Sequence, residues 1–521
     1  MNAIYLAERE KNSCDSSRSK KQWDCVIKWL ENLYKGTIVA CTGFGKTRIA
    51  MHIIRLLKRN KPERSVVIVV PSHQLKQQWE KGLKKLSLDN NVHVWIVNTL
   101  INQSKIECDL LILDEVHRIP APTFSKTFKV VSYKFILGLT ATLRRSDGKH
   151  KVIEKKAPVL ERIPLREARK NGWVSNYRHY NLYVEMSEDT KLNYVNKTKL
   201  FGKAMDKFGR DFNYMKDCTN LKPYKREGRW QPPPVVELAK SLGWRGNHIG
   251  SAFDNIRYNK TAPRGQKRSI WGNDEHTYSP KRLNTWAIIG MQAIRDIKSL
   301  IYNSPEKVEA GIELLSKLKK RTITFSQITE TADKIKEALP RETVVYHSDI
   351  QPEIRITLVE KEYKTKKGLE KFFSKKESKE WTKKEKYGKF YAQKYENKKI
   401  PASKIKEEAI HKILNTKTVR IIATGKALNE GFDAPEISMA VIFSRTTSDL
   451  DETQRIGRAV RTHTFDDGQE KESIIVDIIL KNTKDEIWAG KSQNGLIGII
   501  HVNSIEELLQ KEAAFGQKAI G

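Results

Sequence analysis

The sequence predicts an α/β protein in which two parallel sheets follow one another along the chain. Short apolar runs alternate with longer polar or amphipathic segments at 65–70, 92–97, 110–113 and 135–139. A second series of such runs lies at 322–325, 343–346, 419–423, 439–443 and 473–479. This alternation is typical of parallel sheets that are covered on both faces. A phosphate-binding pattern occurs in the first series alone, so we expect the two sheets to share one ligand.

Residues 40–47, Ala-Cys-Thr-Gly-Phe-Gly-Lys-Thr, predict a loop that binds the phosphates of a nucleoside triphosphate. The loop lies between an apolar run and a segment with apolar residues at helical spacing. Glycines let the backbone approach phosphate oxygens, and a helix N-terminus presents N–H groups to them. Lys46 can then reach the β- and γ-phosphates, and Thr47 can ligate Mg²⁺. The alternative is a glycine-rich turn with an incidental Lys-Thr pair, which the flanking strand and helix disfavour.

Two carboxylates, Asp114 and Glu115, follow the apolar run at 110–113, and His117 comes two residues later. Charges at the exit of a buried strand need a partner, and the hydrated Mg²⁺ that accompanies a nearby triphosphate can be that partner. We expect Asp114 to hold hydrated Mg²⁺ and Glu115 to orient and deprotonate the attacking water. The alternative is a solvated Asp-Glu turn.

Two further segments complete the expected chemistry. Thr140 and Thr142 follow the apolar run at 135–139, where their hydroxyls can bridge catalytic groups. Gln454, Arg458 and Arg461 fall at i, i+4 and i+7 and therefore share one stripe of a predicted helix. Arginine suits phosphoryl transfer because its planar fork stays protonated and binds oxygens bidentately. The alternatives are an ordinary turn for the threonines and a solvated basic helix face for the arginines.

The composition is strongly basic, with 96 Lys+Arg against 62 Asp+Glu and a formal charge of +34. A polyanionic partner explains this excess, and simple solubility is the alternative. Residues 361–400 hold fifteen lysines and six glutamates interleaved with eight aromatic residues. We expect there either a helical arm that lies on duplex phosphates and stacks its rings on bases, or a helical hairpin whose rings pack together.

The remaining segments set the expected domain bounds. Residues 187–285 lack a strand rhythm, so we expect a mainly helical or irregular region that is either a second DNA-binding domain or a spacer. The expected organisation is a first domain at 1–165, a connecting region at 166–300, a second domain at 301–490 with a Lys-rich helical insertion at about 351–415, and a C-terminal tail at 491–521.

Several protein classes are disfavoured. The five cysteines are scattered without a CxxC pair, so neither a disulfide framework nor a zinc site is expected. No apolar run is long enough for a membrane span, and the N-terminus lacks the apolar region of a signal peptide. We expect a soluble, cytoplasmic protein without a membrane partner, and the sequence indicates no particular protein partner.

The phosphate loop, the Asp-Glu pair, the two threonines and the arginine segment follow one another along the chain. In this order they resemble the motifs of the superfamily 2 helicases and translocases. The resemblance covers about 20–165 and 300–480 and includes Glu-Gly-Phe-Asp-Ala-Pro at 430–435. Ala40 stands where the general phosphate-loop pattern has glycine, and this variant is itself a helicase form. The resemblance implies two RecA-like domains in tandem, with ATP and Mg²⁺ as ligands.

The resemblance also implies roles for individual residues. The implied catalytic residues are Lys46, Asp114, Glu115, Gln454, Arg458 and Arg461. ATP contacts are implied for Gln22, Thr42, Gly43, Phe44, Gly45, Lys46, Thr47, Gly431, Asp433, Arg458 and Arg461. Coupling of hydrolysis to domain movement is implied for His117, Thr140 and Thr142. Contacts to a nucleic-acid backbone are implied for Pro71, Ser72, Gln78, Thr99, Phe325, Ser326, His347, Ser348 and Thr424.

The motif variants DEVH, GLTAT and GFDAP are nearest to the DNA-directed group, which includes transcription-repair helicases and phage branch-migration helicases. This implies an ATP-dependent DNA helicase or translocase that unwinds or branch-migrates duplex, forked or junction DNA. The implied partner is double-stranded or branched DNA. The alternatives are an RNA helicase, an ATP-gated nucleic-acid sensor, or the motor subunit of a restriction or defence complex.

Overall fold

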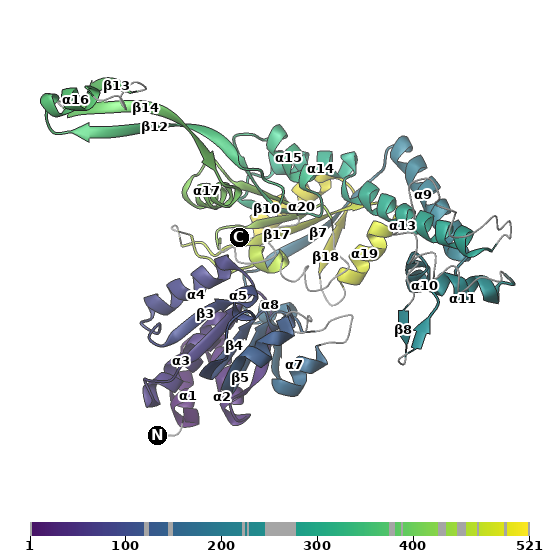
Figure 1. Ribbon diagram of the computed structural model, residues 1–521, viewed down its shortest axis with the longest axis horizontal. Helices are drawn as coiled ribbons and strands as arrows, with labels where there is room; N and C mark the ends of the chain where they lie inside the picture. Colours follow the sequence, from purple (N-terminus) through teal and green to yellow (C-terminus); the bar gives the residue numbers. More distant parts are fainter. Residues whose placement is uncertain are drawn as a thin grey trace, which may run out of the picture. The chain divides into compact units, whose positions relative to one another are not determined.

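The computed structural model divides the chain into two compact units (Figure 1). The first unit comprises Met1–Tyr183, Val308–Ile479 and Ile487–Gly521, and the second comprises Val184–Lys307 and Leu480–Glu486. The structure describes residues 3–118, 124–143, 150–220, 224–226, 229–244, 278–374, 381–386, 389–425, 434–444, 455–465, 468–493 and 498–518.

The first unit contains a six-stranded sheet in the order β3-β2-β4-β5-β1-β6. Each pairing in this sheet is parallel. The strands are β1 (Lys35–Ala40), β2 (Val66–Val70), β3 (Val92–Ile96), β4 (Ile106–Asp114), β5 (Val131–Thr140) and β6 (Val159–Ile163). The helices of this part are α1 (Ala3–Asn12), α2 (Ser17–Glu31), α3 (Lys46–Asn60), α4 (His73–Lys85), α5 (Val97–Leu100), α6 (Thr127–Val130), α7 (Lys151–Lys156) and α8 (Leu165–Lys170).

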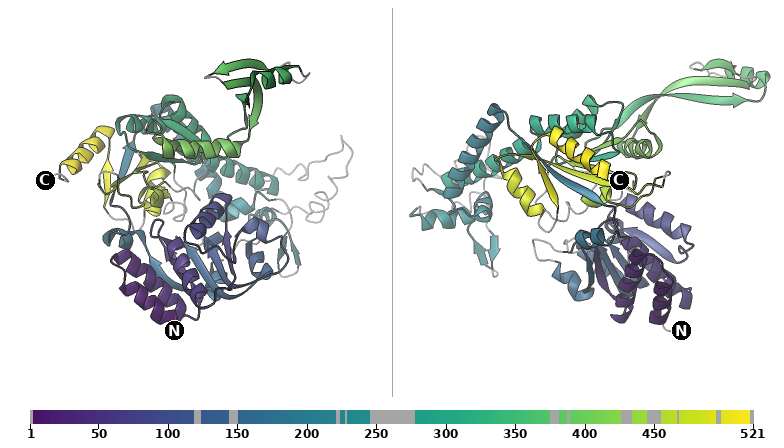
Figure 2. Two further views of the ribbon diagram at one scale, coloured as in Figure 1. Left: turned by 90° about the vertical axis from the view of Figure 1, so that its left-hand side faces the viewer. Right: turned by 180° about the vertical axis from the view of Figure 1, so that it is seen from behind.

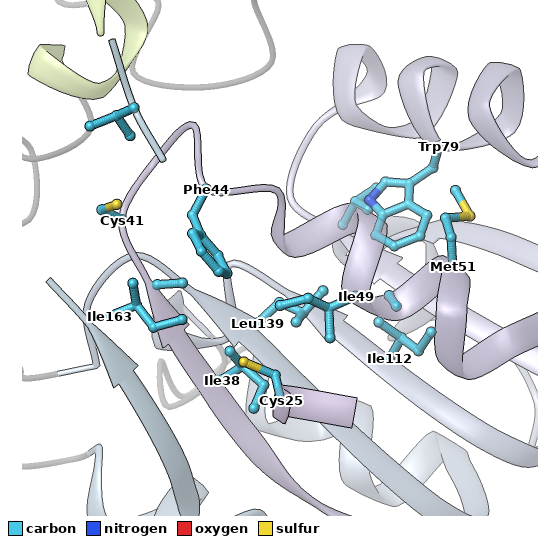
Figure 3. Close-up of a cluster of buried hydrophobic side chains, with 14 of the residues drawn as sticks. Cys25, Ile38, Cys41, Phe44, Ile49, Met51, Trp79, Ile112, Leu139 and Ile163 are labelled. Carbon is cyan, nitrogen blue, oxygen red and sulfur yellow. The ribbon is translucent and has the colours of Figure 1, made fainter. Parts of the chain in front are cut away.

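Strand β2 shows why these runs are apolar throughout. Val66, Ile68 and Val70 belong to one core cluster, whereas Val67 and Val69 belong to another. Successive side chains of a strand point to opposite faces, so both faces of the sheet are covered. Figure 3 shows part of the larger cluster, where side chains from the strands meet Cys25 and Ile49 from the helices.

The first unit also contains a seven-stranded sheet in the order β11-β15-β10-β16-β17-β7-β18. The β10–β15, β10–β16, β11–β15, β16–β17 and β7–β18 pairings are parallel. Its strands are β7 (Tyr177–Val184), β10 (Thr322–Ser326), β11 (Thr343–His347), β15 (Ile421–Gly425), β16 (Met439–Ile442), β17 (Ser473–Leu480) and β18 (Ile499–Val502). The nearby helices are α14 (Pro305–Lys317), α15 (Thr329–Ala338), α17 (Ala402–Asn415), α19 (Lys484–Ser492) and α20 (Ile505–Lys518). The predicted fold class of two parallel α/β sheets is confirmed.

Two strands of this sheet lie outside the expected bounds of 301–490. Strand β7 comes from the expected connecting region, and β18 comes from the expected C-terminal tail. Strand β7 contains the buried polar residues His179 and Asn181. Because these residues interrupt the apolar run, the hydrophobicity pattern does not reveal the strand. Both side chains have polar partners inside the sheet, where His179 Nε2 lies 2.5 Å from Asp477 Oδ2 and Asn181 Nδ2 donates to Gln493 Oε1 at 3.0 Å.

The second unit is mainly helical, as the sequence predicts. It contains α9 (Glu188–Asp206), α10 (Phe212–Asp217), α11 (Pro234–Ser241), α13 (Pro280–Tyr302) and a hairpin of β8 (Tyr224–Arg226) and β9 (Arg229–Gln231). Helices α9 and α13 approach closely at Gly290, where a Cβ atom would lie 2.9 Å from Ala204 Cβ. Its core brings together Ala204, Met215 and Val235 from three of these helices.

The prediction of a Lys-rich helical insertion in the second domain is wrong. Strands β12 (Glu353–Tyr363), β13 (Thr382–Lys386) and β14 (Lys389–Ile400) form an antiparallel sheet in the order β12-β14-β13. One short helix, α16 (Lys366–Phe373), accompanies them. The β-branched and aromatic residues of these segments alternate with polar ones, and this period-two pattern outweighs the helix preference of the lysines.

A membrane span was not expected from the sequence. None of the helices among the described residues combines the length and the apolar character that crossing a membrane requires.

Candidate functional site

The phosphate-loop pattern connects β1 to α3, as a phosphate-binding loop requires. Gly43 and Gly45 have φ angles of +91° and +102°, a conformation that residues with a Cβ rarely adopt. A Cβ atom at Gly45 would lie 2.5 Å from Gln22 Nε2. The N-cap of α3 is Gly45, which has no side chain to cap the helix, and Lys46 Nζ donates to the Ala40 carbonyl at 3.0 Å. The loop thus presents backbone and a cation at a helix N-terminus, an arrangement that suits phosphate.

Phe44 anchors this loop to the core. Its side chain is fully buried, and Figure 3 shows it pointing from the loop into the apolar cluster. Its ring also meets that of Trp173 edge-on, with 5.4 Å between centroids. Any contact between Phe44 and a nucleotide must therefore come from its backbone, because its side chain is part of the core.

Helix α2 holds the same loop through two side chains. Gln22 is buried and donates from Nε2 to the Phe44 carbonyl at 2.7 Å, while its Oε1 has no hydrogen-bond partner among the described residues. Arg18 donates to the carbonyls of Phe44 (3.0 Å) and Gly43, and to Thr462 Oγ1 at 3.0 Å. Sequence reasoning misses Arg18, although its spacing of four residues from Gln22 on one helix is a usable signal.

The two carboxylates stand at the end of β4. Trp79 Nε1 donates to Asp114 Oδ2 at 2.9 Å, and the Glu115 N–H donates to Asp114 Oδ1 at 3.1 Å. Burial raises the pKa of Asp114 to about 6, and the Glu115 carboxylate adds to this shift. Glu115 has a φ of +53°, an unfavourable backbone conformation that is held in place at the centre of the site.

Trp79 is a positioning residue that sequence reasoning does not single out, and a Trp79→Phe variant tests it. We expect this variant to lower kcat for ATP by about tenfold, since a hydrogen bond to a charged group contributes about 1.5 kcal/mol. Steady-state ATPase assays and thermal melting measure the effect. Trp95→Phe, in β3 of the six-stranded sheet, is the matched control. Equal losses of activity in both variants would contradict the positioning role of Trp79.

The three predicted coupling residues lie together. His117 Nδ1 is 3.3 Å from Glu115 Oε2 and 3.0 Å from Thr140 Oγ1. The Thr140 hydroxyl donates to the Thr142 carbonyl at 2.6 Å, so it accepts from His117. Parallel pairing of β4 with β5 brings these side chains to one sheet edge. His117 therefore lies between Glu115 and Thr140, and hydrogen bonds connect His117 through Thr140 to Thr142.

The second sheet's part of the chain brings Arg461 and Gly457 to the phosphate loop and Arg458 close to Glu115. A Cβ atom at Gly43 would lie 3.6 Å from Arg461 Cγ, and one at Gly457 would lie 2.2 Å from Thr42 Cβ. Burial lowers the pKa of Arg458 to about 10, and the nearby Glu115 carboxylate opposes this shift. Burial also lowers the pKa of Arg461 to about 10, so both guanidinium groups remain charged at neutral pH.

Three of the predicted ATP-site residues, Gln454, Gly431 and Asp433, lie outside the described residues.

The residues expected to contact nucleic acid differ in their exposure. In the second sheet, Phe325, Ser326 and Thr424 are buried. The Phe325 ring packs under the Arg455 guanidinium at 5.5 Å, Ser326 Oγ accepts from the Ile328 N–H, and Thr424 Oγ1 donates to the Thr324 carbonyl. These three residues are buried in the sheet, so the structure does not offer their side chains to a nucleic-acid strand.

The other expected contacts lie at sheet edges or helix ends. His347 is buried, with Nε2 lying 3.1 Å from Asp333 Oδ1, whereas Ser348 is exposed. In the first sheet's part of the chain, Ser72 caps α4 by accepting from the Leu75 N–H at 3.4 Å. Of the remaining residues, Pro71 is half-buried, whereas Gln78 and Thr99 are exposed. Gln74 Nε2 donates to Tyr346 Oη at 2.7 Å, which joins α4 to β11 beside these positions.

The chemistry of the site suits a nucleoside triphosphate with magnesium. Thr47 and Asp114 offer hard oxygen ligands, as Mg²⁺ prefers. Lys46, Arg458 and Arg461 supply positive charge near the glycine loop. The buried Gln22 Oε1 without a partner offers an acceptor beside the same loop.

Comparison with family models finds two matches. Residues 16–108 and 88–145 match the model of the Type III restriction enzyme res subunit. Residues 363–463 match the model of the helicase conserved C-terminal domain. These ranges include the phosphate loop and the carboxylates in the first case and the arginines in the second.

Three similar proteins illustrate the range of relatives. The DNA 3'-5' translocase XPB2 of Sulfurisphaera tokodaii is 22% identical over 481 residues, which are 89% of this chain and 82% of that protein. A putative ATP-dependent RNA helicase of Acanthamoeba polyphaga mimivirus is 27% identical over 245 residues, 43% of each chain. The crystal structure of the Pyrococcus furiosus Hef helicase domain covers 92% of this chain and 99% of its own, with 15% identity and a TM-score of 0.45.

Proposed function

We propose that this superfamily 2 helicase, an ATP hydrolase with two RecA-like domains, is a motor that unwinds or branch-migrates duplex, forked or junction DNA. One observation carries the proposal. Both arginines come from the second sheet's part of the chain, yet Arg461 lies beside the phosphate loop of the first part and Arg458 lies near its Glu115. A hydrolytic site built from both domains makes ATP turnover and domain movement one event.

The residues divide the work of hydrolysis as follows. Lys46 and the loop backbone bind the β- and γ-phosphates of the substrate. Thr47 and Asp114 would hold Mg²⁺, which would neutralise charge between these phosphates. Glu115 orients the attacking water and takes its proton, while the two arginines stabilise negative charge on the transferred group. Gln22 contributes a buried acceptor beside the loop.

Movement follows from the contacts of Glu115. The Glu115 carboxylate and the Thr140 hydroxyl both lie beside His117 Nδ1, and Thr140 donates to the Thr142 carbonyl. A change at the γ-phosphate that moves Glu115 therefore also changes the contacts of Thr140 and Thr142. A nucleotide that binds the closed arrangement more tightly shifts the population towards it, and hydrolysis reverses the shift. With a strand across both domains, each cycle moves the protein along that strand.

ATPase and strand-displacement assays with single strands, forks, four-way junctions and RNA duplexes test this function. We expect DNA to stimulate turnover, forks or junctions to be remodelled, and Lys46→Ala to lose both activities by at least about 100-fold, because a buried charge contact to the transferred group is lost. Lys61→Ala, just after the same helix, is the control. DNA-stimulated turnover without strand displacement would instead favour an ATP-gated sensor.

An RNA helicase is the second candidate, because the mimivirus relative carries that name. The same assays distinguish a DNA motor from an RNA helicase, since preferential unwinding of RNA duplexes would identify RNA as the substrate. Dependence of all activity on added subunits would favour a restriction or defence motor, as the name of the first family model suggests.

A further inference from the structure

The antiparallel sheet at residues 353–400, here called the arm, has two different faces. Its strands pair with one another in the order β12-β14-β13, and α16 lies with β13 at the far end of the ribbon (Figure 1). The same ribbon is drawn in green in Figure 2. Pairing of Val359 with Lys394 and of Leu358 with Tyr395 shows which residues share a face.

One face is filled by its own aromatic residues. The Phe372 ring lies 5.4 Å from that of Trp381 and 5.7 Å from that of Tyr363. Lys361 and Lys394 lie over the Trp381 ring, at 5.0 and 4.9 Å from its centroid. These rings form a small core under α16, so they are not free to stack on bases. The expected hairpin whose rings pack together is therefore closer to the structure than the expected stacking arm, although its backbone is a sheet.

The opposite face carries a stripe of apolar side chains that are exposed to solvent. Ile354, Ile356 and Leu358 follow one another on alternate positions of β12, and Tyr395 stands opposite Leu358 on β14. Their exposed fractions are 71%, 72%, 43% and 74%. Four large apolar side chains in a row on one face are unusual for a surface that meets only water.

The stripe's face carries lysines together with Glu360 and Glu362, and the arm as a whole is basic. The arm holds fifteen lysines and one arginine against eight glutamates, a net charge of +8. The register places Lys384 and Lys399 on the stripe's face, with Lys399 directly opposite Ile354. Both lysines are exposed. A partner for this face must combine a dense negative charge with apolar surface, and an acidic phosphate backbone beside base edges does so.

We propose that this face of the arm, the stripe with Lys384 and Lys399, binds in a groove of duplex nucleic acid. The part of the arm that carries the stripe is formed by β12 and β14 alone, because β13 pairs only with Lys389–Gln393. A two-stranded β-ribbon has the width that a duplex groove admits, and apolar side chains in a groove pack against base edges or wedge between base steps. The lysines bind phosphates on the groove walls. The inference rests on the proposed action on DNA, which it extends by assigning a duplex-holding surface outside the ATP site.

The test uses the full-length protein carrying Ile354→Ser and Ile356→Ser together. Ile288→Ser with Ile487→Ser is the matched control, because these isoleucines are also exposed, at 50% and 57%, and lie outside the arm. Fluorescence anisotropy measures affinity for duplex and for single-stranded DNA without nucleotide. We expect about tenfold weaker duplex binding in the arm variant, unchanged single-strand binding and an unchanged ATPase rate with single strands.

A second variant, Lys384→Gln with Lys399→Gln, probes the phosphates. We expect the slope of log affinity against log salt for duplex to fall by about 2 when two phosphate contacts are lost. An unchanged duplex affinity and salt slope would overturn the proposal. If, in addition, Ile354→Ser with Ile356→Ser abolished self-association in sedimentation, the face would belong to a second copy of the chain. A wild type that binds duplex without ATP turnover would refute the proposed motor and leave the arm inference standing.

Discussion

Replacement of Glu115 by Gln lowers ATP turnover by about 10²- to 10⁴-fold while ATP binding persists, the range expected for loss of a general base. Glutamine keeps the shape of the side chain but cannot accept the proton of the attacking water. The residual contacts of Lys46 and the glycine loop do not depend on this carboxylate, so the nucleotide remains bound. Single-turnover hydrolysis and equilibrium binding of labelled ATP measure the two effects separately.

Glu107→Gln is the matched control for this variant. Glu107 lies on the same strand, β4, but it is exposed and distant in sequence from the carboxylate pair. We expect its turnover to equal that of the wild type. Retention of more than about a tenth of the activity in Glu115→Gln would assign the proton transfer to another group.

Replacement of Arg458 by Ala has the second large effect, a fall in kcat of about 10³-fold, as is typical for removal of an arginine finger. The guanidinium is buried, and its pKa of about 10 keeps it charged at neutral pH. Its removal therefore withdraws a full charge from a site of low dielectric, where that charge interacts strongly with the transferred group. Pre-steady-state hydrolysis with and without DNA measures the loss.

Two further variants make the test of Arg458 specific. Arg458→Lys should restore little activity, because an ammonium group cannot replace the bidentate planar fork. Arg341→Ala, at an exposed position of the same domain, should leave turnover unchanged. If Arg458→Ala hydrolysed ATP within about threefold of the wild type, the site would not be shared between the two domains in the way that the phosphoryl-transfer mechanism requires.

Local patterns predicted the parts of the site that depend on local geometry. The loop at 40–47 needs glycines with positive φ angles, followed by a helix N-terminus. Both requirements can be recognised from a few neighbouring residues. Asp114 and Glu115 follow an apolar run directly, so their place at a strand end can also be predicted. His117 and Thr140 could be expected to meet because parallel strands end at one sheet edge.

The residues that escaped prediction owe their roles to distant partners. Arg18 acts through the carbonyls of Gly43 and Phe44, and Trp79 acts through Asp114. Phe325 fits a strand-binding motif by sequence, but Arg455 packs on its ring and the sheet buries it. Apart from the spacing of Arg18 from Gln22, nothing within a few residues of these positions reveals such partners.

By itself, the sequence determined the fold class, the glycine loop between β1 and α3 and the carboxylates at the end of β4, because each depends on residue type and short spacing. Of the predicted arginine stripe, Gln454 lies outside the described residues, and Arg461 lies beyond the helix that contains Arg458. The tertiary structure alone decided that β7 and β18 complete the second sheet, that the basic insertion is a β-ribbon, and which of its faces is open. The physical reason is that strand pairing and burial arise between segments far apart in the chain. Polar residues such as His179 can then lie in a core, and apolar ones such as Ile356 can lie in the open, against the pattern of their own segment.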